Sequence, residues 1–324
     1  MKIINTHTGK LFVDEERKLE FVSVGDYGQS ENVKADFLGL KKEINGVKHH
    51  NVNLTEKWIT LISTQKGCPM KCAFCDCPQV GFFGNATVKD LTYELRTVLE
   101  SFPEINHTKR FNLHFARMGE PTFNQAVLYF TEFELVPLIR SYISTDVIHP
   151  VLATMLPKTN NDLYYFLRTW CRIKNEVYDG HAGLQLSIQS TDDRQRDKQF
   201  NGLSLSLYEI ACLMARLPAP KKRKYTLNFA ITEQSIIDAK LLDEFFNKDY
   251  FLVKLTPVHE TKTAVKNGFD IGRSYETFNI YKRFEEPLLE LGWDVISAIP
   301  SREEDSDRIT CGNALIATME ADHG

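Results

Sequence analysis

Four of the seven cysteines in this chain lie close together in the stretch QKGCPMKCAFCDC (65–77). Cys68, Cys72 and Cys75 have the spacing CxxxCxxC, and Cys77 follows two positions later. Thiolates are soft ligands that favour zinc or iron–sulfur clusters. A loop with three thiolates can bind three irons of a four-iron cluster, which leaves the fourth iron open to a substrate or cofactor. The spacing therefore predicts an iron–sulfur site.

The main alternative is a structural zinc site that uses all four of these cysteines. Structural zinc sites usually take their ligands from two separated pairs, such as two CxxC units. No second unit of that kind occurs elsewhere in the chain. The iron–sulfur interpretation is therefore favoured, and Phe74 between the last two cluster cysteines is expected to cover the cluster and exclude water.

Composition limits the class of protein. The 324 residues are 43% hydrophobic and 25% charged, which is ordinary for a globular protein that buries a large core. The length is within the range of one α/β barrel domain. A net charge of -4 and a pI of about 6.2 do not indicate a strongly basic nucleic-acid binder. A local basic run such as KKRK (221–224) could still contact phosphate, although such runs are more often solvated loops.

The N-terminus MKIINTHTGK lacks the apolar segment of a secretory signal, and no run of 18 apolar residues occurs. We therefore expect a cytoplasmic protein with no membrane partner. In that compartment clustered cysteines are more often metal ligands or redox groups than disulfides.

From residue 58 onward, apolar β-like runs alternate with amphipathic helical windows, which predicts parallel β/α units. The expected strands are 58–63, 111–116, 150–154, 184–189, 225–232, 251–258 and 293–299. The expected helices are 88–102, 206–217, 238–246 and 275–291. Six or seven units fit an open or partial (β/α)6 barrel better than a closed eight-stranded one.

Two regions are expected. Residues 1–57 are turn-rich and alternating, which indicates a short β-rich N-terminal extension. Residues 58–324 form the barrel together with a C-terminal segment. In such barrels chemistry gathers at the carboxyl ends of the strands, and Cys68 comes directly after the first barrel strand. The cysteines should therefore lie at the mouth of the barrel.

A CxxxCxxC loop after the first strand of a partial β/α barrel resembles the radical S-adenosylmethionine (SAM) superfamily. The resemblance implies a [4Fe-4S] cluster whose open iron chelates the methionine part of SAM, and reductive cleavage to a 5′-deoxyadenosyl radical. MGEP (118–121) follows the second strand, where the superfamily carries a GGE-like motif that meets the SAM amino group. The SAM contacts implied in this way are Gly119, Glu120, Thr154, Ser187, Gln189 and His259.

The motifs in order resemble a narrower group, the RlmN/Cfr-type (class A) radical SAM methyltransferases. Their cluster region, SSQVGCxxxCxFC, is similar to STQKGCPMKCAFC (63–75), and their MGMGEPLLN is similar to ARMGEPTFN (116–124). Their INLIPWN is similar to VKLTPVH (253–259). Their C-terminal RxxRGxDIxAACGQL is similar to IPSREEDSDRITCGNAL (299–315). The similarity covers roughly residues 58–318.

This resemblance implies a catalytic role for Cys311, the cysteine of TCGNAL. In the family the matching cysteine accepts a methyl group from one SAM, and a second SAM supplies the radical that activates it. The carbon then adds to an sp2 carbon of adenine in RNA, a carbon too weakly nucleophilic for ordinary methyl transfer. By itself, a lone cysteine is more often a small buried hydrophobe. The implied partners are RNA or a nucleotide-like substrate and a reductant protein such as flavodoxin or ferredoxin.

The chain also departs from the family. The family has a second essential cysteine, which resolves the covalent enzyme–substrate adduct. It lies seven residues before the first cluster cysteine, and that position is Leu61 here. Cys77 is a substitute by proximity, or a bystander. The RNA methyltransferases carry a helical accessory domain before the barrel, whereas this sequence has about 57 β-rich residues there, so that domain is expected to be missing or replaced. Other groups that could act as a base are Glu303, Glu304, Asp305 and His259.

Two enzyme hypotheses follow. The first is a radical SAM C-methyltransferase, which Cys311 favours. The alternative is a radical SAM enzyme on the same scaffold that abstracts hydrogen without methylation. It would carry out a rearrangement or ring formation on a small molecule, nucleotide or peptide, and Leu61 favours it. A non-enzymatic iron–sulfur or zinc protein is a third class, and the position of MGEP after the second strand argues against it.

Overall fold

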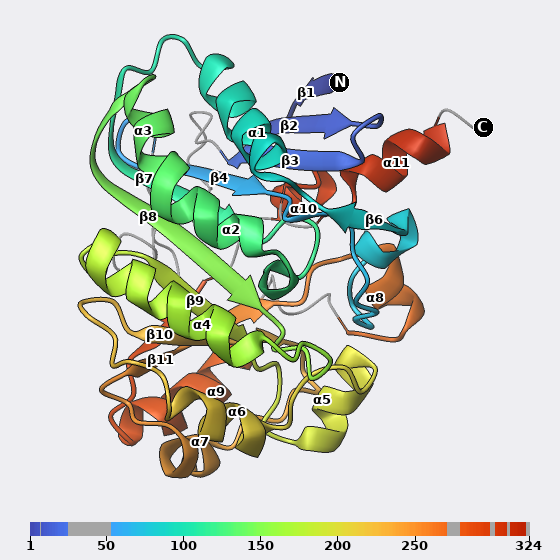
Figure 1. Ribbon diagram of the computed structural model, residues 1–324. Coiled ribbons are helices and arrows are strands. Elements are labelled where there is room, and N and C mark those ends of the chain that lie inside the picture. Colours follow the sequence, from blue (N-terminus) through green and yellow to red (C-terminus); the bar gives the residue numbers. More distant parts are fainter. Residues whose placement is uncertain (7, 25–52, 271–278, 299–301, 310–311, 322–324) are drawn as a thin grey trace.

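The fold was described from a computed structural model, which covers residues 1–6, 8–24, 53–270, 279–298, 302–309 and 312–321 (Figure 1). Its large sheet has the strand order β1-β2-β3-β4-β7-β8-β9-β10-β11-β12. The strands are β1 (Lys2–Asn5), β2 (Gly9–Asp14), β3 (Leu19–Val24), β4 (Trp58–Ile62), β7 (His107–Phe115), β8 (Ser144–Thr154), β9 (Gly183–Ser187), β10 (Tyr225–Ile231), β11 (Phe251–Pro257) and β12 (Val295–Ser297).

From β4 to β12 each strand runs parallel to its neighbours. Each of the seven sequence windows expected to be strands overlaps one of these strands, and β7, β8 and β9 begin earlier than expected. The expected α/β fold with a parallel sheet is therefore confirmed. In the described part of the chain, these seven strands form the parallel part of the sheet.

Helices connect the strands. They are α1 (Val88–Glu100), α2 (Gln125–Tyr129), α3 (Leu135–Arg140), α4 (Leu163–Arg172), α5 (Asp193–Phe200), α6 (Leu207–Met214), α7 (Ala239–Phe245), α8 (Lys262–Lys266), α9 (Asn279–Glu290), α10 (Arg302–Ser306) and α11 (Ala314–Ala321). Thr87 with Asp90 and Ser206 with Glu209 form capping boxes that start α1 and α6. The four expected helices are confirmed. Helix α9 begins at the first described residue after a gap.

The core lies between the sheet and the helices. In β7, Phe111, Leu113 and Phe115 are fully buried on the helix side, and Phe115 meets Trp170 of α4 edge to face at 5.9 Å. Their neighbours Asn112 and His114 point to the opposite face, because side chains alternate along a strand. Figure 1 shows α2, α3 and α4 lying across this outer face. The inner face of the sheet is left for the site.

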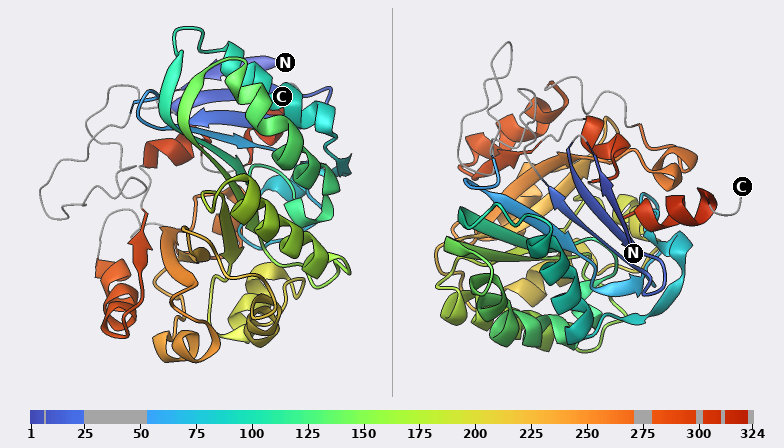
Figure 2. Two further views of the ribbon diagram at one scale, coloured as in Figure 1. Left: turned by 60° about the vertical axis from the view of Figure 1, so that its left-hand side comes forward. Right: turned by 90° about the horizontal axis from the view of Figure 1, so that it is seen from above.

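The N-terminal strands continue the barrel sheet. Strands β1, β2 and β3 are antiparallel to one another, and β3 pairs antiparallel with β4 so that Val22 faces Leu61. The β-rich pattern expected for 1–57 is present in 1–24, whereas 25–52 lie outside the described residues. Figure 2 shows α11, near the C-terminus, on the same side of the molecule as these strands. The two ends of the chain thus meet beside the barrel.

The basic run KKRK precedes β10 and so lies at the amino end of the strands, away from the cysteines. Lys221 and Lys222 pair with Asp179, and Lys224 pairs with Asp294 at 2.6 Å. Three of the four cations of this run are therefore paired within the fold, at the end of the strands opposite to the barrel mouth. None of the helices in the described ranges has the length and hydropathy needed to span a bilayer.

Candidate cluster and cofactor site

The cysteine loop, residues 68–81, is closed at its base by a small hairpin. Strands β5 (Gln65–Gly67) and β6 (Phe82–Asn85) are antiparallel, and the Cys68 amide donates to the Gly81 carbonyl at 3.1 Å. Gly67 has φ +80°, and a Cβ there would lie 1.8 Å from the Gly81 oxygen. Only glycine fits this point. The loop follows β5, which separates it from the end of β4 at Ile62.

The loop opens on a cavity of about 170 Å³ at the carboxyl ends of the parallel strands. Residues far apart in the sequence line it together. From the predicted site these are Cys68, Cys72, Cys75, Cys77, Gly119, Glu120, Thr154 and Ser187. The first four come from the cysteine loop, and the others follow or end β7, β8 and β9. The fold thus brings eight predicted residues into one cavity.

The three cluster thiols differ in their pKa shifts, because a hydrogen bond with the Cys77 thiol lowers the pKa of Cys75 whereas the pKa values of the other two are raised. Burial and the neighbouring Cys75 raise the pKa of Cys68 to about 12. Burial, together with Cys75 and Cys68, also raises the pKa of Cys72 well above its usual range. In the metal-free protein both sulfurs are therefore held as thiols, and a bound cationic centre would supply the charge that stabilises thiolates.

The chemistry of this donor set fits an iron–sulfur cluster. Three thiols on one loop border a shared cavity, and a four-iron cluster takes one thiolate per iron, so its ligands need not converge on one point. Within the described ranges, no group of three or more His, Cys, Asp and Glu side chains is arranged to hold a metal ion. Phe74 packs edge to face against Phe200 at 5.8 Å and against Phe269 at 6.1 Å, beside the loop.

Glu120 is fixed at the strand ends by protein donors. Its Oε1 accepts from the Thr154 hydroxyl at 2.7 Å and the Thr122 hydroxyl at 2.7 Å, and its Oε2 accepts from the Met155 amide at 2.9 Å. Burial raises the pKa of Glu120, and these hydrogen bonds oppose that rise. Oε1 thus accepts two of these three hydrogen bonds and Oε2 accepts one. Together they hold the carboxylate in one orientation at the cavity.

Gly119 allows the strand-end motif to approach the residues before the cysteine loop. It has φ +99°, and a Cβ would lie 2.5 Å from Gln65 Cβ. The Glu120 amide donates to Gln65 Oε1 at 2.8 Å, and the Thr64 amide donates to the Met118 carbonyl at 2.8 Å. The two sequence motifs are therefore joined directly by hydrogen bonds.

Two predicted SAM contacts do not line the cavity. Gln189 adopts φ +66°, and its Oε1 accepts from the Ala230 amide, so the side chain ties the end of β9 to β10. His259 lies beyond β11, with Nδ1 2.9 Å from Asp305 Oδ1, and the Glu260 amide donates to the same carboxylate. A role of either residue toward SAM stays a prediction.

Cys77 is brought against the C-terminal segment, a contact that no sequence spacing indicates. Cys311 itself lies outside the described residues. The next residue, Gly312, has its carbonyl oxygen 2.9 Å from Cys77 Sγ. A thiol hydrogen bond with Cys75 and burial raise the pKa of Cys77 well above its usual range. The fourth cysteine of the loop is thus the one that contacts the residue following Cys311.

Replacing Gly312 by alanine is expected to push the C-terminal segment away from the loop. The added Cβ would lie 2.5 Å from Cys77 Sγ and 2.7 Å from the Arg117 carbonyl oxygen. Overpacking of this kind costs about 1–3 kcal/mol. Chemical denaturation should show that loss relative to the unchanged protein. Gly292→Ala is the control, because a Cβ there meets nothing within 4 Å and only the backbone strain at φ +81° remains. Equal losses in the two variants would contradict the close contact.

Leu61 occupies an apolar position. It pairs with Val22 of β3 and with His114 of β7, and it packs against a buried cluster that includes Cys77 and Met118. The position where the resemblance implies a resolving thiol is therefore occupied by an apolar side chain that packs against the N-terminal strands.

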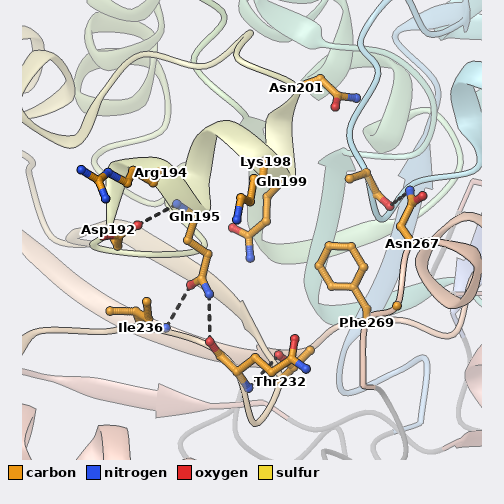
Figure 3. A pocket seen from close by; sticks show the side chains of 13 residues that line it. Asp192, Arg194, Gln195, Lys198, Gln199, Asn201, Thr232, Ile236, Asn267 and Phe269 are labelled. Carbon is orange, nitrogen blue, oxygen red and sulfur yellow. Dashed lines mark hydrogen bonds between the residues drawn. The ribbon is translucent and has the colours of Figure 1, made fainter.

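A second, larger pocket of about 600 Å³ lies behind the cysteine loop (Figure 3). Its walls are α5, the loop after β10 and residues 267–269. Gln195 bridges two of these walls, because its Oε1 accepts from the Ile236 amide at 3.0 Å and its Nε2 donates to the Gln234 carbonyl at 2.8 Å. Asn267 donates to the Ala73 carbonyl at 2.7 Å, which links the third wall to the cysteine loop.

Gln199 is a buried polar group of this pocket. It is 8% exposed, and its Oε1 has no hydrogen-bond partner among the described residues. Figure 3 shows it on α5, between Gln195 and Phe269, with Lys198 beside it. Sequence reasoning missed this pocket because DRQRDKQF reads as a solvated helix. The signal that could have found it is the stretch SIQSTDDRQRDKQFNG (187–202), which is loosely similar to the SLHA-like strand followed by R and PIN of the RlmN/Cfr-type enzymes.

Comparison with known proteins finds matching relatives but no matching family model. The chain is 35% identical over 82 residues to the dual-specificity RNA methyltransferase RlmN of Sulfurovum sp., which is 25% of this chain and 21% of that protein. It is 31% identical over 151 residues to the probable RlmN of Heliobacterium modesticaldum, which is 42% of this chain and 32% of that protein. The matched stretches thus span about a fifth and about a third of these relatives.

Among solved structures, a radical SAM methyltransferase from Sphaerobacter thermophilus is similar over 92% of this chain and 76% of that protein. Its TM-score is 0.57 at 17% sequence identity, so the likeness shows a shared fold. Together with the RlmN matches, it confirms the resemblance to RlmN-type radical SAM methyltransferases that the motifs predict.

Proposed function

We propose that this chain is a radical SAM enzyme that methylates an sp2 carbon of a nucleobase, in RNA or a nucleotide-like substrate, by way of Cys311. The observation that supports it most directly is the cavity shared by Cys68, Cys72 and Cys75 with Gly119 and Glu120. Motifs that are separate in the sequence border the same cavity there, which supports the proposal.

The residues of the cavity have distinct roles in this proposal. Cys68, Cys72 and Cys75 would hold a [4Fe-4S] cluster, which when bound supplies the electron that cleaves SAM to a 5′-deoxyadenosyl radical. Glu120 is a carboxylate acceptor for the SAM ammonium group, and Gly119 lets the backbone approach it. The hydroxyls of two further cavity residues, Thr154 and Ser187, would orient the rest of the methionine part.

Cys311 is the methyl carrier and Cys77 the second thiol. The contact between Cys77 and Gly312 supports this assignment, because it puts a thiol beside the residue that follows Cys311. Leu61 remains the feature that favours the alternative, hydrogen abstraction without methylation on a small molecule, nucleotide or peptide.

The pocket behind the cysteine loop supports a nucleotide-like substrate. A glutamine amide can pair with the edge of a base, an aromatic ring can stack on it, and cations can bind phosphate. Gln199 and Phe269 supply the first two groups, and Arg194 and Lys198 supply the charges. We propose a reductant protein such as flavodoxin or ferredoxin as electron donor, in the cytoplasm.

Anaerobic reconstitution tests this proposal. We expect about four irons per chain and release of 5′-deoxyadenosine on addition of SAM and dithionite. Mass spectrometry of the purified protein should show an added CH2 on Cys311. One zinc and no iron would overturn the radical SAM assignment. Cleavage of SAM without any modification of Cys311 would overturn the methyl-carrier role and favour the alternative.

A further inference from the structure

A fully buried ion pair joins the N-terminal strands to the strand-end motif of the barrel. Arg117 Nε lies 2.8 Å from Glu20 Oε1, and both side chains are 0% exposed. Glu20 belongs to β3, and Arg117 immediately precedes MGEP. Removing two charges from water is costly, and the cost is offset only when the remaining donors and acceptors are also bonded. The hydrogen-bond partners of the remaining Arg117 and Glu20 side-chain atoms therefore show which part of the chain the ion pair holds in place.

Those atoms bind the C-terminal segment. Arg117 Nη1 donates to the Ile309 carbonyl at 2.8 Å, and Nη2 donates to the Arg308 carbonyl at 2.7 Å. Glu20 Oε2 accepts from the Leu315 amide at 2.6 Å. These anchors fall on either side of Cys311 in the sequence. The pair thus ties the segment down both before and after that cysteine.

Cys77 packs against the same place. Its Sγ is 3.7 Å from the Arg117 carbonyl and 2.9 Å from the Gly312 carbonyl. Gly312 in turn has no room for a side chain, because a Cβ would lie 2.7 Å from the Arg117 oxygen. Around these polar contacts lies an apolar cluster that includes Leu11, Val13, Val22, Met118, Ile309, Ala314 and Leu315. Exclusion of water strengthens the hydrogen bonds inside it.

Both partners lie where this chain departs from the sequences it resembles. In ARMGEP, Arg117 takes the place of the first glycine of the similar MGMGEP, and a glycine there has no side chain to reach the segment. Glu20 belongs to the N-terminal extension, in β3. The same extension packs on Leu61, where the resolving thiol is missing. The two departures are therefore connected in space.

We propose that Glu20 and Arg117 are positioning residues that hold the C-terminal segment over Cys77, so that the N-terminal strands form part of the methyl-transfer site. The role of Glu20 and Arg117 in methyl transfer rests on the proposed function. Their contacts with the C-terminal segment do not depend on that function.

The test is the double variant Glu20→Leu with Arg117→Met. Replacing both members of a buried pair by apolar side chains of similar volume is often tolerated by the fold. We expect the iron content and the 5′-deoxyadenosine release of this variant to match those of the unchanged protein. The amount of added CH2 on Cys311 should fall about a hundredfold, because a small misplacement of a reacting group has an effect of that size. Arg117→Lys keeps the charge but not the planar guanidinium fork. Its level of Cys311 modification should lie between those of the unchanged protein and the double variant.

A matched control is Arg172→Lys, because Arg172 pairs with Glu132 at 2.6 Å on a partly exposed helix surface. It should leave the iron content, SAM cleavage and Cys311 modification unchanged. Deuterium exchange at the Leu315 amide measures the contact without reference to any methyl group, and its protection should be lost in the double variant.

The outcomes separate the two proposals. Unchanged Leu315 protection, or unchanged Cys311 modification at equal iron content, would overturn the positioning role. The unchanged protein could carry no CH2 on Cys311 while the double variant still loses Leu315 protection. That result would support the positioning role of Glu20 and Arg117 and overturn the methyl-carrier function of Cys311.

Discussion

Replacing Cys72 by alanine is expected to abolish both cluster binding and SAM cleavage. Cys72 is the central member of CxxxCxxC and lies in the cavity with Cys68 and Cys75, which contribute to its raised pKa. With one of three ligands gone, two thiolates remain for a cluster that needs each of its coordinated irons capped. Iron analysis after anaerobic reconstitution and chromatography of 5′-deoxyadenosine measure the two losses.

Cys212→Ala is the matched control for this change. Cys212 is exposed on α6, outside the residues that line the cavity, so its replacement should preserve the iron content and SAM cleavage. A Cys72→Ala protein that still binds about four irons and cleaves SAM would show that the ligand assignment is wrong.

Replacing Cys77 by alanine is expected to leave the enzyme covalently attached to its substrate after one transfer. In the proposed reaction the carbon carried on Cys311 sulfur becomes bonded to the base. The Cys77 thiol would release it by forming a disulfide with Cys311 as the carbon–sulfur bond breaks, and the thiol proton would pass to the transferred carbon. The contact of Cys77 Sγ with the Gly312 carbonyl at 2.9 Å is the structural basis for this role.

The adduct can be sought by mass spectrometry of the Cys77→Ala protein purified from cells under denaturing conditions. The added mass would also identify the substrate class. Cys171→Ala serves as control, because Cys171 is buried in α4 and does not line the cavity. Normal turnover without an adduct would contradict the role of Cys77 and direct attention to other groups, such as His259 with Asp305.

Short-range features of this protein follow from its sequence. The spacing of Cys68, Cys72 and Cys75 acts within a few residues, where chain geometry leaves few choices. Alternating apolar runs predict the parallel strands because each must bury its side chains under helices. The position of MGEP after the second strand then places Glu120 at the barrel mouth.

Longer-range contacts could not be predicted in the same way. The pattern divides the chain near residue 57, whereas in the structure β3 pairs with β4 in one sheet. In the sequence, Glu20 and Arg117 are isolated charged residues that resemble ordinary surface charges. Only their burial against each other in the fold makes them an ion pair. The pocket around Gln199 likewise depends on how α5 meets the loops after β10 and α8.

The sequence by itself determined the donor chemistry: three thiols with cluster spacing and a carboxylate in register at the end of the next strand. Only the tertiary structure decided which groups surround the C-terminal segment. It placed Cys77 beside Gly312 and tied Arg308, Ile309 and Leu315 to the Glu20–Arg117 pair. The physical reason is that ligand spacing is a local property of the chain. A buried ion pair forms only where the whole fold excludes water from two charges that are distant in sequence.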